Sequence, residues 1–191
     1  MKFTEGNLFH IYNRGNNRQT IFFTQANFLY FLKKIRKYIH PHCEILTFCL
    51  MPNHFHFLIY ANSKTVSRDD IGRNLTSEGF RHLLSSYTKA INVQEKRVGS
   101  LFTQNTHSKK VDNTLNQALN CFMYIHQNPM RSGLVKKMED WEYSSFRDYC
   151  NLRKGTLCNK KLAFDLLNLS EDNFYELSYE LIPKDKIREI F

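Results

Sequence analysis

Two histidines at alternate positions, His54 and His56, are the first candidates for a chemical role. They open a short apolar, aromatic-rich run, residues 54–60, that predicts a β-strand. Successive side chains of a strand point to opposite faces, so the two imidazoles should share one face and Phe55 and Phe57 the other. Two imidazoles on one face can hold a metal ion, with exposed or hydrogen-bonded histidines as the alternative interpretation.

A second segment carries Tyr124 and Asn128, which are four residues apart and so share one face of a helix. Residues 114–127 have helical spacing, and their core-facing stripe comprises Leu115, Ala118, Leu119, Phe122 and Ile125. Pro129 disfavours helical geometry at the preceding residue, which predicts that Asn128 lies at the helix end, where it can act as a ligand. A half-buried tyrosine and a helix cap are the alternative interpretation of this pair.

These residue types together point to transesterification at a phosphodiester. A phenol with a pKa of ~10 is a poor nucleophile at neutral pH, so Tyr124 needs an electrophile that a cation activates. A divalent ion held by His54, His56 and the amide oxygen of Asn128 would keep open positions for phosphate oxygens. Mixed nitrogen and oxygen ligation suits Mg²⁺, Mn²⁺ or Zn²⁺, and the sequence leaves the choice open.

The segments around these residues predict a mixed series of strands and helices. We predict a strand over 8–13, a helix from 24 to before Pro41, a hairpin of strands 44–50 and 54–60, a polar loop over 62–73, a helix over 74–93, a strand near 106–111 and the helix over 114–127. This order matches a ferredoxin-like βαββαβ core, an α+β fold with helices against one face of an antiparallel sheet.

The segment beyond Trp141 has a different pattern. Short helical pieces follow this residue, and residues 159–182 predict one or two amphipathic helices. We therefore expect a catalytic domain over residues 1–150 and a C-terminal helical extension over residues 151–191.

The charge of the chain favours a polyanionic partner. The 27 Lys and Arg against 18 Asp and Glu give a net charge of +9 and a pI near 9.3. Residues 161–191 carry four basic and seven acidic side chains, so 23 basic and 11 acidic side chains fall in residues 1–160. For any single run of basic residues, a solvated helix or loop face is the favoured interpretation.

The cysteine content and the hydropathy of the chain indicate the cellular compartment of the protein. The five cysteines form no CxxC pair, which indicates neither a zinc ribbon nor a disulfide framework and fits a reducing cytoplasm. No apolar run approaches the ~20 residues of a membrane span, and no secretory signal is recognisable. We expect a soluble intracellular protein with no membrane partner.

Four short segments resemble motifs of a known superfamily. Residues 51–56 (MPNHFH) look like the histidine motif of the HUH single-strand transposases of insertion sequences. Residues 12–16 (YNRGN), 124–135 (YIHQNPMRSGLV) and 141–146 (WEYSSF) are similar to motifs of the REP-associated tyrosine transposases. Three spaced motifs in the right order are far more specific than the histidine pair alone.

The resemblance implies a HUH transposase in which His54, His56 and Asn128 bind a divalent ion, Mg²⁺ or Mn²⁺. Insertion-sequence relatives often have glutamine at the third ligand position. Tyr124 would attack DNA to leave a 5′-phosphotyrosine and a free 3′-hydroxyl, and the reverse attack would rejoin the strand. The expected partner is single-stranded DNA folded into imperfect hairpins, in the cytoplasm and associated with the nucleoid. Homodimer and monomer both stay open, since insertion-sequence relatives exchange tyrosine helices and REP-associated ones can act alone.

Further residues are candidates for DNA contact or for structure. The expected DNA contacts are Arg14, Asn16, Asn17, Arg18, Lys109, Lys110 and Arg131. His10 could approach the metal site or form a structural hydrogen bond. His126 should face away from Tyr124 and be structural, and Trp141 should be a packing anchor.

Three other functions stay open on the sequence. The chain could be a domesticated nucleic-acid hairpin-binding protein that does not cleave. It could be a metal-dependent hydrolase of small phosphoesters in which Tyr124 is only structural. A replication initiator or relaxase would share the metal chemistry, but the tail has no pattern typical of a helicase.

Overall fold

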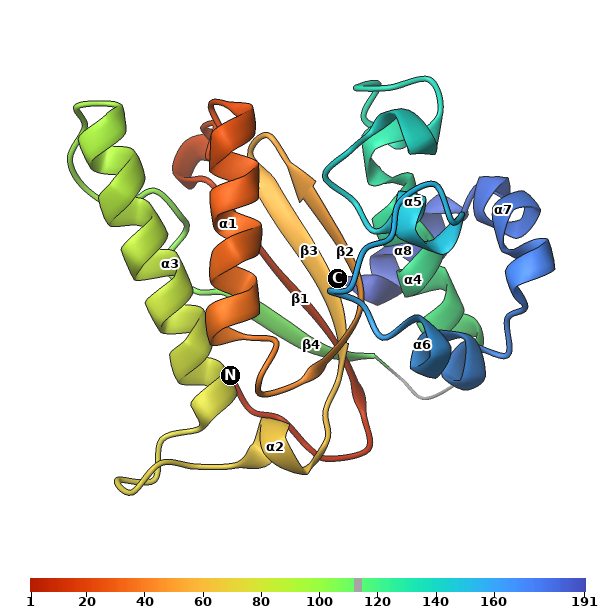
Figure 1. Cartoon of the computed structure of the whole chain (residues 1–191), viewed down its shortest axis with the longest axis horizontal. Coiled ribbons are helices and arrows are strands. Elements are labelled where there is room, and N and C mark those ends of the chain that lie inside the picture. Colours follow the sequence, from red (N-terminus) through yellow and green to blue (C-terminus); the bar gives the residue numbers. More distant parts are fainter. Residues whose placement is uncertain (112–114) are drawn as a thin grey trace.

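The computed structural model describes residues 1–111 and 115–191. Its centre is a four-stranded sheet in the order β2-β3-β1-β4, with every neighbouring pair antiparallel (Figure 1). The strands are β1 (Leu8–Arg14), β2 (Glu44–Met51), β3 (His54–Tyr60) and β4 (His107–Val111). This order is that of a ferredoxin-like core, so the predicted α+β fold is confirmed.

Helices fill most of the connections between the strands and form the tail. The α-helices are α1 (Gln25–Tyr38), α2 (Ser63–Val66), α3 (Leu75–Gln94), α4 (Leu115–Arg131), α5 (Phe146–Tyr149), α6 (Lys160–Leu167), α7 (Glu171–Tyr179) and α8 (Lys184–Ile190). Short 3-10 helices cover Asn16–Arg18 and Met138–Asp140. Within the described residues, no helix has both the length and the apolar character that crossing a membrane would require.

Two of these helices differ from the sequence prediction. The segment 62–73 is not all loop, because the Asn62 side chain accepts a hydrogen bond from the backbone of Thr65 (3.2 Å) and caps the short helix α2. Helix α8 extends the tail beyond the helices expected up to residue 182. The predicted helix start at Thr114 and the core-facing side chain of Leu115 lie outside what the structure describes.

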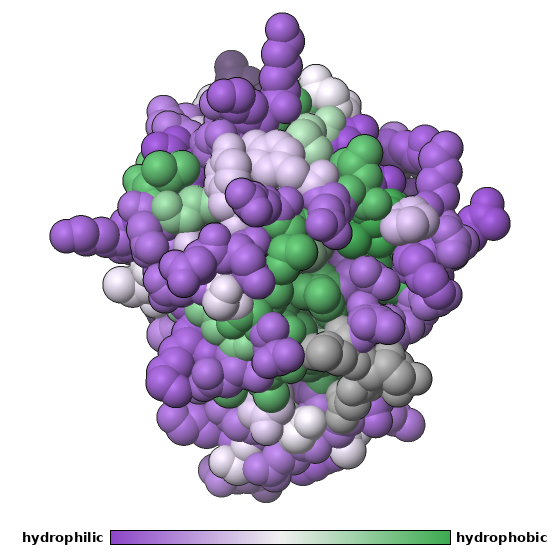
Figure 2. Space-filling model, turned by 90° about the vertical axis from the view of Figure 1, so that its right-hand side faces the viewer, coloured by the Kyte–Doolittle hydropathy of each residue, from purple (hydrophilic) through white to green (hydrophobic). Residues whose placement is uncertain are grey.

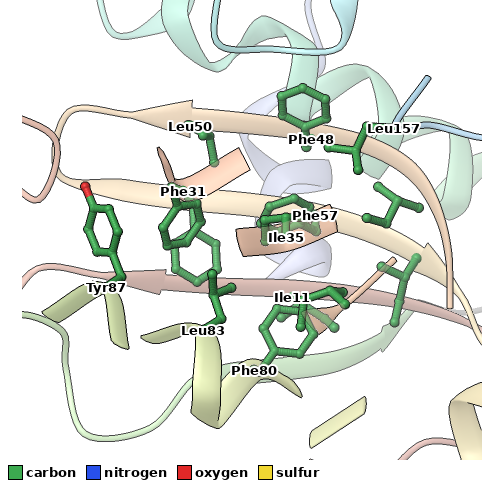
Figure 3. Close-up of a cluster of buried hydrophobic side chains, with 14 of the residues drawn as sticks. Ile11, Phe31, Ile35, Phe48, Leu50, Phe57, Phe80, Leu83, Tyr87 and Leu157 are labelled. Atoms are coloured by element: carbon green, nitrogen blue, oxygen red, sulfur yellow. The ribbon is translucent and has the colours of Figure 1, made fainter. Parts of the chain in front are cut away.

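Helices α1 and α3 cover one face of the sheet. The hydrophobic side chains packed between these helices and the sheet, many of them aromatic, form the first core. Figure 3 shows Phe57 and Ile11 of the strands facing Phe31 of α1 and Phe80 of α3. All four side chains are at most 1% exposed. Burial of large side chains at this density is the main stabilisation of the fold.

The other face of the sheet is covered too, by α4 and the tail. Leu46 and Leu58 of the strands pack there with Phe122 and Ile125 of α4, and helices α6, α7 and α8 contact α4 (Figure 1). The expectation that helices cover only one face was therefore wrong. Every residue of β2 after Glu44 is buried, so both faces of the sheet needed cover. Figure 2 shows the tail side, where hydrophobic side chains gather within a hydrophilic surround.

The end of α4 corrects another expectation, because the helix continues through Pro129 to Arg131. The backbone N–H of Ser132 donates to the carbonyl of Asn128 (3.0 Å), so Asn128 lies inside the last turn. The side chain of the buried Gln127 donates to two carbonyls of the tail (2.9 and 2.7 Å). These contacts hold the last turn helical and outweigh the preference of a residue before proline for extended geometry.

His126 and Trp141 occupy structural positions. His126 is fully buried, and its Nε2 lies 2.8 Å from the hydroxyls of Thr47 and of Ser145. Burial lowers the pKa of His126 to about 3, so the ring is neutral. The indole N–H of Trp141 donates to the carbonyl of Leu50 (2.9 Å), which ties the segment after α4 to the sheet.

An ion pair fixes the chain where the tail begins, and its loss should be costly. Arg153 donates to both carboxylate oxygens of Asp148 (2.6 and 3.0 Å), and the Asp148 side chain is only 3% exposed. Arg153→Met should lower the free energy of unfolding by about 3 kcal/mol, because it leaves a buried carboxylate unpaired. Urea denaturation measures this change. Asp148→Asn in the same background should recover part of the loss, and a purely additive double mutant would contradict the pairing.

Candidate active site

Strand β3 carries the two predicted metal ligands on the face that α4 covers. The ring centroids of His54 and His56 are 5.0 Å apart. Phe55 and Phe57 belong to the core on the opposite face. The strand alternation predicted from the sequence therefore holds, and the two imidazoles converge on one side of the sheet.

The hydrogen bond of His54 leaves one ring nitrogen for a ligand. Its Nδ1 lies 2.6 Å from the amide oxygen of Asn53, which can only accept, so Nδ1 carries the proton. Burial lowers the pKa of His54, and the side chain of Asn128 acts in the opposite direction. The neutral ring then presents an unprotonated Nε2.

His56 is almost fully buried and is also bonded through Nδ1. That atom lies 2.9 Å from Nε2 of His10 on the neighbouring strand β1. Burial holds the pKa of His56 well below its usual range, and the nearby rings of His10 and His54 lower it further. Nε2 is thus the nitrogen of His56 that is left for a ligand.

Helix α4 brings Tyr124 and Asn128 to this face of the sheet. The ring of Tyr124 lies 6.0 Å from that of His56, centroid to centroid. Burial raises the pKa of the Tyr124 phenol, while Asn128 and the charge of Arg131 lower it. The amide nitrogen of Asn128 donates to the carbonyl of Tyr124 (3.0 Å). Side-chain hydrogen bonding by Asn128 also affects the pKa values of His54 and Tyr124, so the amide group lies at the site.

A cleft of about 490 Å³ opens beside these residues. Its lining includes His54, His56 and Tyr124, together with two exposed arginines, Arg14 and Arg18. The cleft thus joins a phenol, two neutral imidazoles and two guanidinium groups. This set of side chains suits an anionic substrate with phosphate oxygens.

The donor set fits a divalent ion. Two unprotonated imidazole nitrogens and one amide oxygen are neutral ligands of the mixed type that Mg²⁺, Mn²⁺ and Zn²⁺ accept. Over residues 1–111 and 115–191, no three or more His, Cys, Asp or Glu side chains form a group that could hold a metal. The expected set of His54, His56 and Asn128 includes an amide, which is outside those residue types.

The loop after β1 places some of the candidate DNA contacts at the cleft. Arg14 and Arg18 line it. Asn16 and Asn17 begin the 3-10 helix that ends at Arg18, and the Asn16 side chain donates to the carbonyl of Ser100 (3.2 Å). Asn17 is exposed beside the two arginines, so this loop offers both charge and amide groups to a ligand.

The other candidate DNA contacts lie on β4 and α4. Lys109 donates to the carbonyls of Glu189 and Phe191 (2.8 and 2.9 Å), and Arg131 donates to a carbonyl between α7 and α8 (3.0 Å). Lys110 is exposed on β4. DNA contact by Lys109 or Arg131 stays a prediction that requires these bonds to the tail to be exchanged.

Three aromatic side chains of the cleft were not predicted. Tyr12 and His107 stack with ring centroids 4.8 Å apart, and Phe191 contacts the rings of His56 (5.8 Å) and Tyr124 (5.4 Å). Tyr12 could have been found, because it lies in a quoted motif and alternates with His10 on one strand. Nothing in the sequence pattern singled out His107 or Phe191.

Comparisons with known proteins bear on this fold. No family model matches the chain, and no curated protein matches it. The solved structure of a REP-associated tyrosine transposase bound to a REP hairpin is similar, with a TM-score of 0.59 and 20% identity over 79% of this chain and 83% of that one.

A second structure is more distant. A bacterial tRNA(His) guanylyltransferase-like protein in complex with GTP has a TM-score of 0.41 and 10% identity over 69% of this chain and 68% of that one, which is too low to support an argument. The resemblance to REP-associated tyrosine transposases, predicted from the motifs, is confirmed at the level of the fold.

Proposed function

We propose that the chain is a metal-dependent, single-tyrosine transposase that nicks and rejoins single-stranded hairpin DNA. The observation that carries this proposal is the convergence of Tyr124, His54 and His56 on one cleft, with Asn128 one turn from the tyrosine. The similar fold of a transposase bound to a REP hairpin supports DNA hairpins as the partner. The two arginines of the cleft support a phosphate-bearing substrate.

In the proposed reaction, the phenolic oxygen of Tyr124 forms a bond to the scissile phosphorus as the bond to the 3′-oxygen breaks. The phenol loses its proton and the leaving 3′-oxygen gains one, which yields a 5′-phosphotyrosine and a 3′-hydroxyl. A divalent ion, Mg²⁺ or Mn²⁺, bound by His54, His56 and Asn128 would polarise the phosphate and offset the developing charge. Because burial raises the pKa of Tyr124, the phenol depends on such nearby positive charge.

We further propose that cleavage occurs within one chain. Tyr124 and His56 of the same chain already have their rings 6.0 Å apart, so no helix exchange between subunits is needed. These residues fall in the proposed catalytic domain, residues 1–150. In the proposed extension, residues 151–191, helices α6, α7 and α8 pack against α4 and would hold the tyrosine helix in place.

The test is covalent trapping of DNA by the protein. The full chain is incubated with a set of single-stranded hairpin oligonucleotides, each with 5′ and 3′ flanks, in Mn²⁺, in Mg²⁺ or with EDTA. We expect a species on a denaturing gel that contains both protein and labelled DNA, only with metal and only with hairpins. Tight hairpin binding without any adduct would favour the domesticated, non-cleaving hairpin-binding protein instead.

Arginines of the cleft should set the salt dependence of hairpin binding. Replacing Arg14 and Arg18 together by glutamine should weaken binding and reduce the slope of log K against log salt by about two. Fluorescence anisotropy over a range of NaCl concentrations measures both quantities. Replacing the exposed Lys136 and Lys137 by glutamine removes the same charge elsewhere and should change the slope less. Equal slopes for the two double variants would assign binding to net charge alone.

A further inference from the structure

The side chain of His10 lies next to the proposed metal ligand His56 but has no role in the proposed reaction. Its ring is fully buried on β1, and each ring nitrogen has a partner. Nδ1 lies 3.2 Å from the carbonyl oxygen of Ile190 at the end of α8, and Nε2 lies 2.9 Å from Nδ1 of His56. The ring also packs against Tyr12 and Phe191, with centroids 4.7 and 5.3 Å away.

The hydrogen-bond partners of His10 determine which ring nitrogens of His10 and His56 carry a proton. A carbonyl oxygen can only accept, so Nδ1 of His10 carries a hydrogen and donates it to Ile190. Neither partner of the buried ring is an anion, so the ring is neutral and its Nε2 is an acceptor. Nδ1 of His56 must then be the donor, which leaves Nε2 of His56 without a proton.

We infer that His10 is a positioning residue that holds His56 in the tautomer and orientation needed to bind the metal ion. This inference rests on the proposed function. Metal-binding histidines usually donate their second ring N–H to an acceptor that fixes the ring, and here that acceptor is another imidazole. Asn53 does the same for His54. Because both nitrogens of His10 are engaged, His10 is not itself a ligand.

The tail is linked to the proposed metal site through His10. The carbonyl of Ile190 orients His10, which orients His56, so two hydrogen bonds join α8 to the metal ligand. Removing the nitrogens of His10 should therefore affect the site without touching any ligand. Replacement by phenylalanine keeps the ring packing, whereas glutamine keeps an oxygen acceptor at about the reach of Nε2.

The experiment compares wild type, His10→Phe and His10→Gln in two measurements. Nitrogen-15 NMR of the metal-free full chain reports which nitrogen of His56 carries the proton. We expect the proton on Nδ1 in wild type and in His10→Gln, and a mixture of tautomers in His10→Phe. Titration with Mn²⁺, followed by calorimetry, should give a dissociation constant about tenfold weaker for His10→Phe, with His10→Gln closer to wild type.

Several results would overturn the inference. A wild-type His56 with its proton on Nε2 would do so by itself, even if His10→Phe fails to fold. Unchanged Mn²⁺ affinity in a folded His10→Phe would do so as well. Failure of the proposed function looks different: wild type would then bind Mn²⁺ no better than His56→Ala, while the tautomer of His56 would still respond to His10.

Discussion

Replacing Tyr124 by phenylalanine is expected to abolish the covalent adduct between the protein and hairpin DNA. The substitution removes only the phenolic hydroxyl group, whose oxygen is the proposed nucleophile. Cleavage should fall by roughly 10³-fold or more, as when other covalent nucleophiles are removed. Single-turnover cleavage of labelled hairpins, resolved on denaturing gels, measures the rate.

The same variant should leave the fold and hairpin binding intact. The Tyr124 ring contacts the rings of His56 and Phe191, and a phenylalanine ring can keep both contacts. Tyr30→Phe is the matched control, since it removes the same oxygen from an exposed residue of α1 and should cleave at the wild-type rate. An adduct that persists in Tyr124→Phe would assign the nucleophile to another residue. Unchanged hydrolysis of small phosphoesters would instead favour a hydrolase with a structural tyrosine.

The second large effect is expected when both proposed histidine ligands are lost. The double variant of His54→Ala and His56→Ala should no longer respond to Mn²⁺ or Mg²⁺. A divalent ion contributes several kcal/mol of charge stabilisation at a phosphate, so cleavage should fall by about 10³-fold. Cleavage rates with metal and with EDTA, together with the shift in Tm that Mn²⁺ causes, measure this loss.

Hairpin binding provides the control for that double variant. Arg14 and Arg18 of the cleft are untouched by it, so the affinity for DNA should change only a few-fold. His40→Ala, at an exposed histidine after α1, should keep the response to metal. If His40→Ala and the double variant lose activity alike, the effect is not one of metal binding. If neither loses activity, the ligands lie elsewhere.

Local periodicity was enough to predict much of the site. Side chains alternate between the two faces along a strand, so the spacing of His54 and His56 predicted that they share a face. This prediction needs only the backbone geometry of the strand. Helical spacing likewise placed Tyr124 and Asn128 on one side of α4. The predicted order of strands and helices added the ferredoxin-like core, whose strand order the structure confirms.

The sequence prediction was wrong at the end of α4, where a local preference competed with tertiary contacts. Pro129 predicted a helix end at Asn128, but buried contacts of Gln127 with the tail hold the helix for another turn. Lys109 stays a predicted phosphate contact, but its hydrogen bond to a carbonyl of the tail was not predicted. Neither outcome can be read from a residue's own neighbours, because the competing partner lies far away in the chain.

Local sequence patterns therefore establish the type of each chemical group and the face of the strand or helix on which it lies. Contacts between groups of different elements depend on the folded arrangement, in which His10 meets His56 across two strands and Phe191 lies beside Tyr124 at the cleft. The reason is physical. Side-chain direction within an element follows from a repeating backbone geometry, whereas contact between elements depends on packing summed over both faces of the sheet.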